Sequence, residues 1–204
     1  MKKAKILVIG ETGFIGSKLM KKLKSKKYKP FGFSRKFDIL VHLAAKLPDS
    51  RSEAYEYFMI NCMGLLNALE FARRNKVKIV IFTSSASVYS PDTPYGLSKL
   101  TGEMWCRLYS KMYGMEIWAI RAHTLYGGKK SRSVVTKFIK QKLEGQKLTI
   151  YGDGRQTRYF VHVNDVVDAI YKIIELRSGK KMSINEVAKL IKNAQKKKLR
   201  ELLK

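Results

Sequence analysis

The chain has 204 residues, of which 42 are Lys or Arg and 16 are Asp or Glu, so its formal net charge at pH 7 is +26. Hydrophobic residues make up 45% and aromatic residues 11%, which is enough for a buried core and excludes an intrinsically disordered chain. The length suits one domain, or one domain with a small satellite. No apolar stretch is long enough for a signal peptide or a membrane span, so we expect no membrane partner and a reducing, cytoplasmic compartment.

Cysteine and histidine, two common metal ligands, are scarce in this chain and do not favour a metal site. Cys62 and Cys106 lack ligand spacing, are too few for a disulfide framework and resemble small core residues within helices. The chain has three histidines in all, and a packed core position is expected for His42 at the end of a strand. We therefore expect no metal.

The positive charge is concentrated towards the two ends of the chain. Residues 1–36 hold 12 basic and one acidic side chain, and residues 177–204 hold 10 and two. Most lysines of residues 16–27 lie off an apolar helical face, which is typical of a solvated surface. A nucleic-acid patch would need arginines at phosphate spacing with interleaved aromatics, so nucleic acid is not the expected partner. A positive field should still attract small polyanions.

Short apolar runs alternate with amphipathic helical patterns in chain order. The expected strands are residues 5–9, 28–34, 39–43, 77–83 and 116–121, and the expected helices begin near residue 14 and span about 53–75 and 94–113. This alternation predicts an α/β fold, a Rossmann-like doubly wound parallel sheet over residues 1–128. After Gly128, helices over 134–143 and 166–176 and a short strand over 148–151 predict a small lobe over 129–204. A capping box at Ser183 and Glu186 begins its basic C-terminal helix.

A glycine-rich segment lies directly between the first expected strand and the first expected helix. It reads Gly10-Glu11-Thr12-Gly13-Phe14-Ile15-Gly16. Glycines at this spacing allow a tight turn, close approach of the backbone to a pyrophosphate and close packing of helix on strand, while the helix N-terminus supplies N–H donors. We therefore expect Gly10, Thr12, Gly13, Phe14, Ile15 and Gly16 to bind a dinucleotide rather than form an ordinary glycine turn.

The end of the second expected strand bears on the choice between NAD and NADP. An acidic residue there binds the ribose hydroxyls of NAD, whereas an arginine accommodates the 2′-phosphate of NADP. This chain has Ser34 and Arg35, with no carboxylate before Asp38. The pattern leans towards NADP, but Arg35 is equally compatible with an ordinary surface arginine, so both cofactors stay open.

Tyr95 and Lys99 are four residues apart, on one face of the helix expected at 94–113. A nearby ammonium stabilises a phenolate, so we expect Lys99 to lower the pKa of Tyr95 and make it a general base near neutral pH. A hydroxyl-rich strand end, residues 83–89, precedes this pair and would orient a substrate alcohol or carbonyl.

The motifs and their order resemble the extended short-chain dehydrogenase/reductase superfamily, and within it the NAD-dependent epimerase/dehydratase family, which acts on nucleotide sugars. The matching segments are GETGFIG (10–16), HLAA (42–45), SSASVY (84–89), YGLSK (95–99), Arg121 with Tyr126-Gly127, and TIYGDGRQTRYFVHVND (149–165). The resemblance implies the catalytic residues Ser85, Tyr95 and Lys99. It implies cofactor contacts from Leu43, Ala44, Ala45 and Lys99, substrate contacts from Ser85, Thr124 and Arg158, and a structural role for Asn61.

The resemblance also implies the type of reaction. Ala86 and Ser87 follow the catalytic serine where 4,6-dehydratases carry Asp-Glu, which favours an epimerase. In the implied redox-neutral cycle Tyr95 takes the proton of a sugar hydroxyl, hydride passes to the nicotinamide, the keto sugar turns over and hydride returns to its other face. We therefore expect a nucleotide-sugar epimerase, and by resemblance a homodimer paired through the helices at 53–75 and 94–113.

The chain also departs from the family pattern. Residues 34–36 replace a helix and an edge strand that bear an adenine-contacting Asp, and the long loop between Ser85 and Tyr95 is missing. Thr124 replaces the usual Asn, Tyr159 replaces an Asp, and the substrate lobe stops early. Because these shortenings spare the motifs, they favour a minimised scaffold.

Two other functions stay open. An NADP-dependent reductase of a keto sugar or another carbonyl is favoured by Arg35 and the lost substrate loop, and it would consume NADPH stoichiometrically. A non-catalytic cofactor-binding scaffold is favoured by the truncated lobe.

Overall fold

The computed structural model describes residues 4–28, 30–31, 37–49, 51–128 and 130–177. Two sequence predictions fall on other residues: the NADP-type pair Ser34 and Arg35, and the basic helix expected to begin at Ser183. They lie outside the described residues.

The centre of the molecule is a parallel sheet in the order β2-β1-β3-β4-β5. Its strands are β1 (Ile6–Ile9), β2 (Pro30–Phe31), β3 (Ile39–His42), β4 (Ile79–Ser85) and β5 (Glu116–Ala122). The continuous apolar runs in β1, β3 and β4 suit strands that are covered on both faces. The predicted Rossmann-like α/β fold is confirmed.

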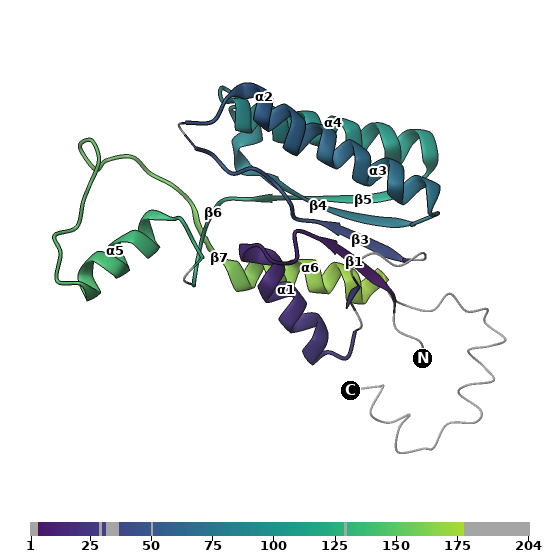
Figure 1. Ribbon diagram of the computed structural model, residues 1–204, viewed down its shortest axis with the longest axis horizontal. Helices are drawn as coiled ribbons and strands as arrows, with labels where there is room; N and C mark the ends of the chain where they lie inside the picture. The colour runs from purple at the N-terminus through teal and green to yellow at the C-terminus, as the bar shows by residue number, and fades with distance from the viewer. Residues whose placement is uncertain (1–3, 29, 32–36, 50, 129, 178–204) are drawn as a thin grey trace, which may run out of the picture.

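Helices cover the two faces of this sheet (Figure 1). On one face lie α1 (Phe14–Ser25) and α6 (Val163–Arg177), and on the other lie α3 (Gly64–Arg74) and α4 (Pro94–Tyr113). Alternate residues of each strand enter opposite cores, because successive side chains of a strand point to opposite faces. In β1, for example, Ile6 and Val8 pack towards α1 and α6, whereas Leu7 packs towards α3 and α4.

The strand order reverses at β1. The chain continues from β1 to β2 on one side and then returns to β3 on the other, so the carboxyl ends of β1 and β3 are adjacent. The carbonyl of Ile9 accepts hydrogen bonds from the backbone N–H groups of Leu43 (2.8 Å) and Ala44 (3.1 Å). In open α/β sheets, ligands bind in the crevice at such a reversal point.

Local signals place α4 accurately. The Thr93 hydroxyl accepts a hydrogen bond from the Gly96 N–H at 3.0 Å, Pro94 occupies the first turn, and the helix ends at Gly114, whose φ is +63°. The helix expected at 53–75 is instead built from α2 (Ala54–Tyr57), the π-helical segment η1 (Phe58–Met63) and α3.

The smaller part of the chain has a two-stranded parallel sheet of β6 (Thr124–Tyr126) and β7 (Phe160–His162), which the sequence analysis did not predict. Helix α5 (Val134–Leu143) is confirmed and projects away from the main sheet in Figure 1. The strand expected at 148–151 is wrong. The amide side chain of Gln141 pairs with the backbone N–H and the hydroxyl of Thr149, which replaces a strand partner.

The C-terminal described helix belongs to the core of the main sheet. α6 was expected in the second lobe, but Val163, Ile170 and Ile174 are fully buried in the cluster that includes α1, β1 and β3. Lys22 of α1 also forms an ion pair with Asp168 of α6. The chain therefore returns to the main sheet after residue 162, and the division at residue 128 stays a prediction.

Among the helices of the described residues, none has the length and apolarity to cross a membrane. Cys62 and Cys106 are free and buried within helical segments, as expected of small core residues.

Candidate active site

The glycine segment forms a cradle in which side chains would collide with backbone. Gly10 has a φ of +90°, and a Cβ added there would lie 2.7 Å from the backbone nitrogen of Ala44. A Cβ added at Gly16 would lie 2.0 Å from the carbonyl oxygen of Gly10. Gly13 caps α1 without a side-chain hydrogen bond, and the first turn holds no acidic residue. The cradle therefore offers backbone N–H donors in a shape that fits a phosphate group.

The residues expected on the nicotinamide side follow the neighbouring strand. Leu43, Ala44 and Ala45 come directly after β3, and Ala44 lies against Gly10. The structure thus brings these residues and the glycine cradle to one edge of the sheet.

The three expected catalytic residues converge at the carboxyl end of β4. Ser85 is the last residue of β4; its hydroxyl donates to that of Ser87 at 3.1 Å, and its interaction with the Tyr95 phenol lowers the pKa of that phenol. Lys99 lies one turn after Tyr95 on α4, and its Nζ donates to the carbonyl of Thr83 at 2.9 Å. The same Nζ lies 5.9 Å from the centroid of the Tyr95 ring.

The electrostatics of this triad differ from the expectation. Burial raises the pKa of Tyr95 above its ordinary value, and the interaction with Ser85 opposes this only in part. The prediction that Lys99 lowers the pKa of Tyr95 is wrong for this structure, because the ammonium is directed to the Thr83 carbonyl. Burial lowers the pKa of Lys99 itself to about 8. Tyr95 is therefore a neutral phenol at pH 7.

Asn61 ties the nicotinamide-side loop to the helix that carries Tyr95. Its Oδ1 accepts from the Lys46 N–H at 2.7 Å, and its Nδ2 donates to the Lys46 carbonyl and to the Ser98 hydroxyl at 3.2 and 2.9 Å. Ser98 in turn donates to the Tyr95 carbonyl at 2.8 Å. Asn61 lies in the π-helical segment η1, and such segments are frequent at functional sites. These bonds support the structural role expected of Asn61.

Glu103 and Arg121 brace the strand end next to Ser85. Glu103 accepts from the Ser84 hydroxyl at 2.5 Å and from the Nε and an Nη of Arg121 at 2.9 and 2.6 Å. The guanidinium of Arg121 lies 4.9 Å from the centroid of the Tyr89 ring. Sequence reasoning missed Glu103, although its spacing of four residues from Lys99 places it on the same side of α4.

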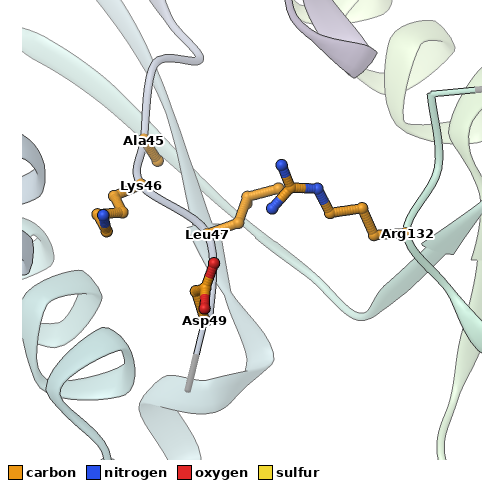
Figure 2. Close-up of a pocket in the computed structure, with 5 residues that line it drawn as sticks. All are labelled: Ala45, Lys46, Leu47, Asp49 and Arg132. Carbon is orange, nitrogen blue, oxygen red and sulfur yellow. The ribbon is translucent and has the colours of Figure 1, made fainter. Parts of the chain in front are cut away.

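A cavity of about 310 Å³ lies along the segment that follows β3; Figure 2 shows the side chains that line it. Its lining residues are Ala45, Lys46, Leu47, Asp49 and Arg132. The hydroxyl of Tyr57 accepts from the Asp49 N–H at 2.9 Å, and the Tyr57 ring lies 6.3 Å from the Tyr95 ring, which links this wall to the triad. Arg132 reaches across from the segment before α5 (Figure 2). Sequence reasoning did not single out these charged residues.

Thr124 and Arg158, which were expected to contact the phosphates of the substrate, do not line this cavity. Thr124 begins β6, and Arg158 belongs to an exposed irregular segment, where its guanidinium donates to the Thr157 carbonyl at 3.4 Å. The backbone N–H of Thr124 donates to the Tyr159 carbonyl at 3.1 Å, so these two positions are near each other. Within the described part of the chain neither forms a hydrogen bond with the triad.

His42 is a buried core residue, as expected. Burial, with a smaller effect from Lys99, lowers its pKa to about 4, so the imidazole is neutral at pH 7. Across the described ranges, no group of three or more His, Cys, Asp or Glu side chains could hold a metal ion.

The parallel sheet, the glycine cradle at its reversal point and the Ser-Tyr-Lys triad define a dehydrogenase/reductase of the extended short-chain type. Residues 31–186 match the profile of the NAD dependent epimerase/dehydratase family. The chain belongs to this family of enzymes.

Several individual proteins are similar to the chain. An uncharacterized UDP-glucose epimerase of Bacillus subtilis is 31% identical, over 83% of this chain and 72% of the relative. A putative UDP-glucose 4-epimerase of Methanocaldococcus jannaschii is 32% identical, over 76% of this chain and 60% of the relative. A Bacillus cereus UDP-glucuronic acid 4-epimerase, solved in complex with UDP-glucuronic acid and NAD, is 30% identical with a TM-score of 0.73, over 87% of this chain and 74% of that one.

Proposed function

We propose that the chain is a nucleotide-sugar epimerase, similar to UDP-sugar 4-epimerases, that uses a bound nicotinamide dinucleotide to oxidise a sugar hydroxyl transiently. The observation that carries this proposal is the convergence of Ser85, Tyr95 and Lys99 at the same carboxyl edge of the parallel sheet as the glycine cradle. The relatives named as UDP-sugar epimerases support it.

The side chains can share the proton chemistry of such a reaction. Ser85 would donate to the reacting sugar oxygen and orient it, and Tyr95 would take and return its proton. Because burial raises the pKa of Tyr95, proton removal requires a positive charge near the phenol. Lys99 would supply it if its ammonium turned from the Thr83 carbonyl towards the phenol once the ligands are bound. When bound, the dinucleotide would accept the hydride and return it.

The contacts of substrate and cofactor remain proposals. We assign the sugar to the cavity near Lys46 and Arg132, and its nucleotide phosphates to Thr124 and Arg158. The glycine cradle fits either dinucleotide. Solved relatives contain NAD, whereas the lean towards NADP rests on Ser34 and Arg35, which lie outside the described residues.

The test is a turnover assay with UDP-glucose, UDP-galactose and UDP-glucuronic acid in the presence of catalytic NAD or NADP. We expect formation of the 4-epimer, followed by proton NMR, without net production of reduced nicotinamide. Stoichiometric oxidation of NADPH with a keto sugar would instead identify a reductase. Dinucleotide binding with no turnover on any of these substrates would identify a scaffold.

We also propose that the chain forms a homodimer through the outer face of α4. Exposed apolar side chains gather there, including Leu97, Met104, Leu108 and Met112. They adjoin a mainly apolar hollow of about 490 Å³ that is also lined by Trp105. An exposed apolar face of this kind marks an interaction surface.

The dimer proposal predicts that Met104→Glu converts the protein to a monomer in size-exclusion chromatography with light scattering. Met104 is 64% exposed in the single chain, so the substitution leaves the core of the protomer unchanged. The matched control is Leu143→Glu on α5, where an apolar residue of 82% exposure lies away from α4. A wild-type monomer, or equal dissociation in both variants, would contradict the proposed face.

A further inference from the structure

A lysine from the segment after β6 contacts the glycine cradle. The Nζ of Lys130 donates to the carbonyl oxygen of Thr12 at 2.7 Å, although the two residues are 118 positions apart. Thr12 belongs to the turn that leads into α1, whose N-terminus has no side-chain cap. The ammonium group therefore lies at the side of the candidate phosphate site.

Glycine backbone brings this segment to the cradle. Gly127 and Gly128 have φ values of +102° and +123°, which side-chain-bearing residues rarely adopt. A Cβ added at Gly128 would lie 3.5 Å from Cε and 3.7 Å from Nζ of Lys18, and 3.8 Å from the ring of Phe14. Gly128 thus packs over the first turns of α1, and the Lys18 ammonium lies beside it.

In the described part of the chain, no acidic side chain pairs with either of these two lysines. Within the described ranges neither Lys18 nor Lys130 forms an ion pair, and Glu11 of the same glycine segment does not pair with either. Two ammonium groups and the N-terminus of α1 consequently add up to a positive potential at one place, where an anionic ligand is favoured.

We propose that Lys130, assisted by Lys18, binds the pyrophosphate of the dinucleotide, so that the segment after β6 closes one side of the cofactor site. This inference rests on the cofactor of the proposed function but not on the epimerase reaction. A phosphate bound at the N-terminal N–H groups of α1 lies in the same turn as the Thr12 carbonyl, within reach of the Lys130 ammonium.

The short connection between β2 and β3 increases the expected contribution of this contact to the affinity for the dinucleotide. β2 ends at Phe31 and β3 begins at Ile39, whereas the family resemblance places an additional helix and strand between the corresponding strands. With that adenine contact absent from the sequence pattern, phosphate contacts from Lys130 and Lys18 would compensate.

The experiment measures binding of NADH and NADPH to the full chain by fluorescence titration at low and high salt. Lys130→Gln keeps a hydrogen-bond donor but removes the charge, and we expect Kd to rise about three- to ten-fold at low salt, with a smaller change at high salt. Lys130→Arg should retain wild-type affinity. The matched control is Lys142→Gln, which makes the same change of net charge at an exposed position on α5 and should leave Kd unchanged.

The outcomes separate a phosphate ligand from a structural tie. The inference would be overturned if Lys130→Gln left Kd unchanged, or if Lys142→Gln weakened binding as much as Lys130→Gln did. Neither result would affect the epimerase proposal. If Lys130→Gln lost the same factor in affinity at every salt concentration and also had a lower Tm, the inference would be overturned as well. That pattern indicates that Lys130 only holds its own segment in place through the hydrogen bond to Thr12. If the wild-type chain binds neither dinucleotide, both this inference and the proposed function fail. Binding without turnover leaves this inference standing and removes the epimerase.

Discussion

The Tyr95→Phe variant is expected to lose sugar epimerisation by about a thousand-fold while its affinity for the dinucleotide stays within about two-fold of wild type. The substitution removes only the phenolic oxygen, which in the proposed reaction exchanges a proton with the substrate. The aromatic ring remains, so the edge-on packing against Tyr57 is retained and the fold should not change. Turnover of UDP-sugars and fluorescence titration with reduced dinucleotide measure the two quantities.

The matched control for this variant is Tyr113→Phe, at the far end of the same helix. The Tyr113 ring packs against Tyr109 and Arg73, away from the triad, so its hydroxyl should be dispensable for turnover. Undiminished epimerisation in Tyr95→Phe would remove Tyr95 from the proton transfer. Equal losses in both variants would indicate a general effect on α4 instead.

The parts of the fold that could be predicted have strong local signals. The buried strands β1, β3 and β4 are continuous apolar runs, and α4 begins with Thr93-Pro94 and ends at a glycine. The strands β6 and β7 have three residues each and pair across more than thirty positions of sequence, so neither carries a period that could be recognised. The strand predicted at 148–151 does not form. The Thr149 N–H donates instead to the side chain of Gln141, and no local pattern indicates this contact.

The same distinction holds for the candidate site. The glycine cradle and the Tyr95–Lys99 pair are encoded by spacing within one element, and the structure brings them to one edge of the sheet. Glu103, Arg132 and Lys130 act across elements, and their partners could be identified only from the tertiary structure. The direction of the Tyr95 pKa was mispredicted for this reason. It depends on burial and on where the Lys99 ammonium points.

Replacing Lys99 by Met should abolish turnover, by about a thousand-fold, and yet stabilise the protein near neutral pH. Lys99 is 3% exposed, and burial lowers its pKa from 10.5 to about 8. This shift corresponds to about 3 kcal/mol of destabilisation when both the folded and the unfolded state are protonated. Loss of the hydrogen bond to Thr83 removes about 1–2 kcal/mol. The net gain at pH 7 is therefore about 1–2 kcal/mol, or a few degrees in Tm.

The pH dependence of this difference distinguishes the buried charge from a packing effect. Between pH 8 and pH 10.5 the folded state of the wild type releases the Lys99 proton while the unfolded state still holds it, so wild-type stability rises relative to Lys99→Met. The advantage of the variant should shrink over this range and reverse near its upper end, where only the lost hydrogen bond remains. The exposed Lys78→Met serves as the control and should differ little from wild type at any pH. A variant that gains the same stability at pH 7 and pH 10 has improved packing, and Lys99 would then not be a strained, buried cation.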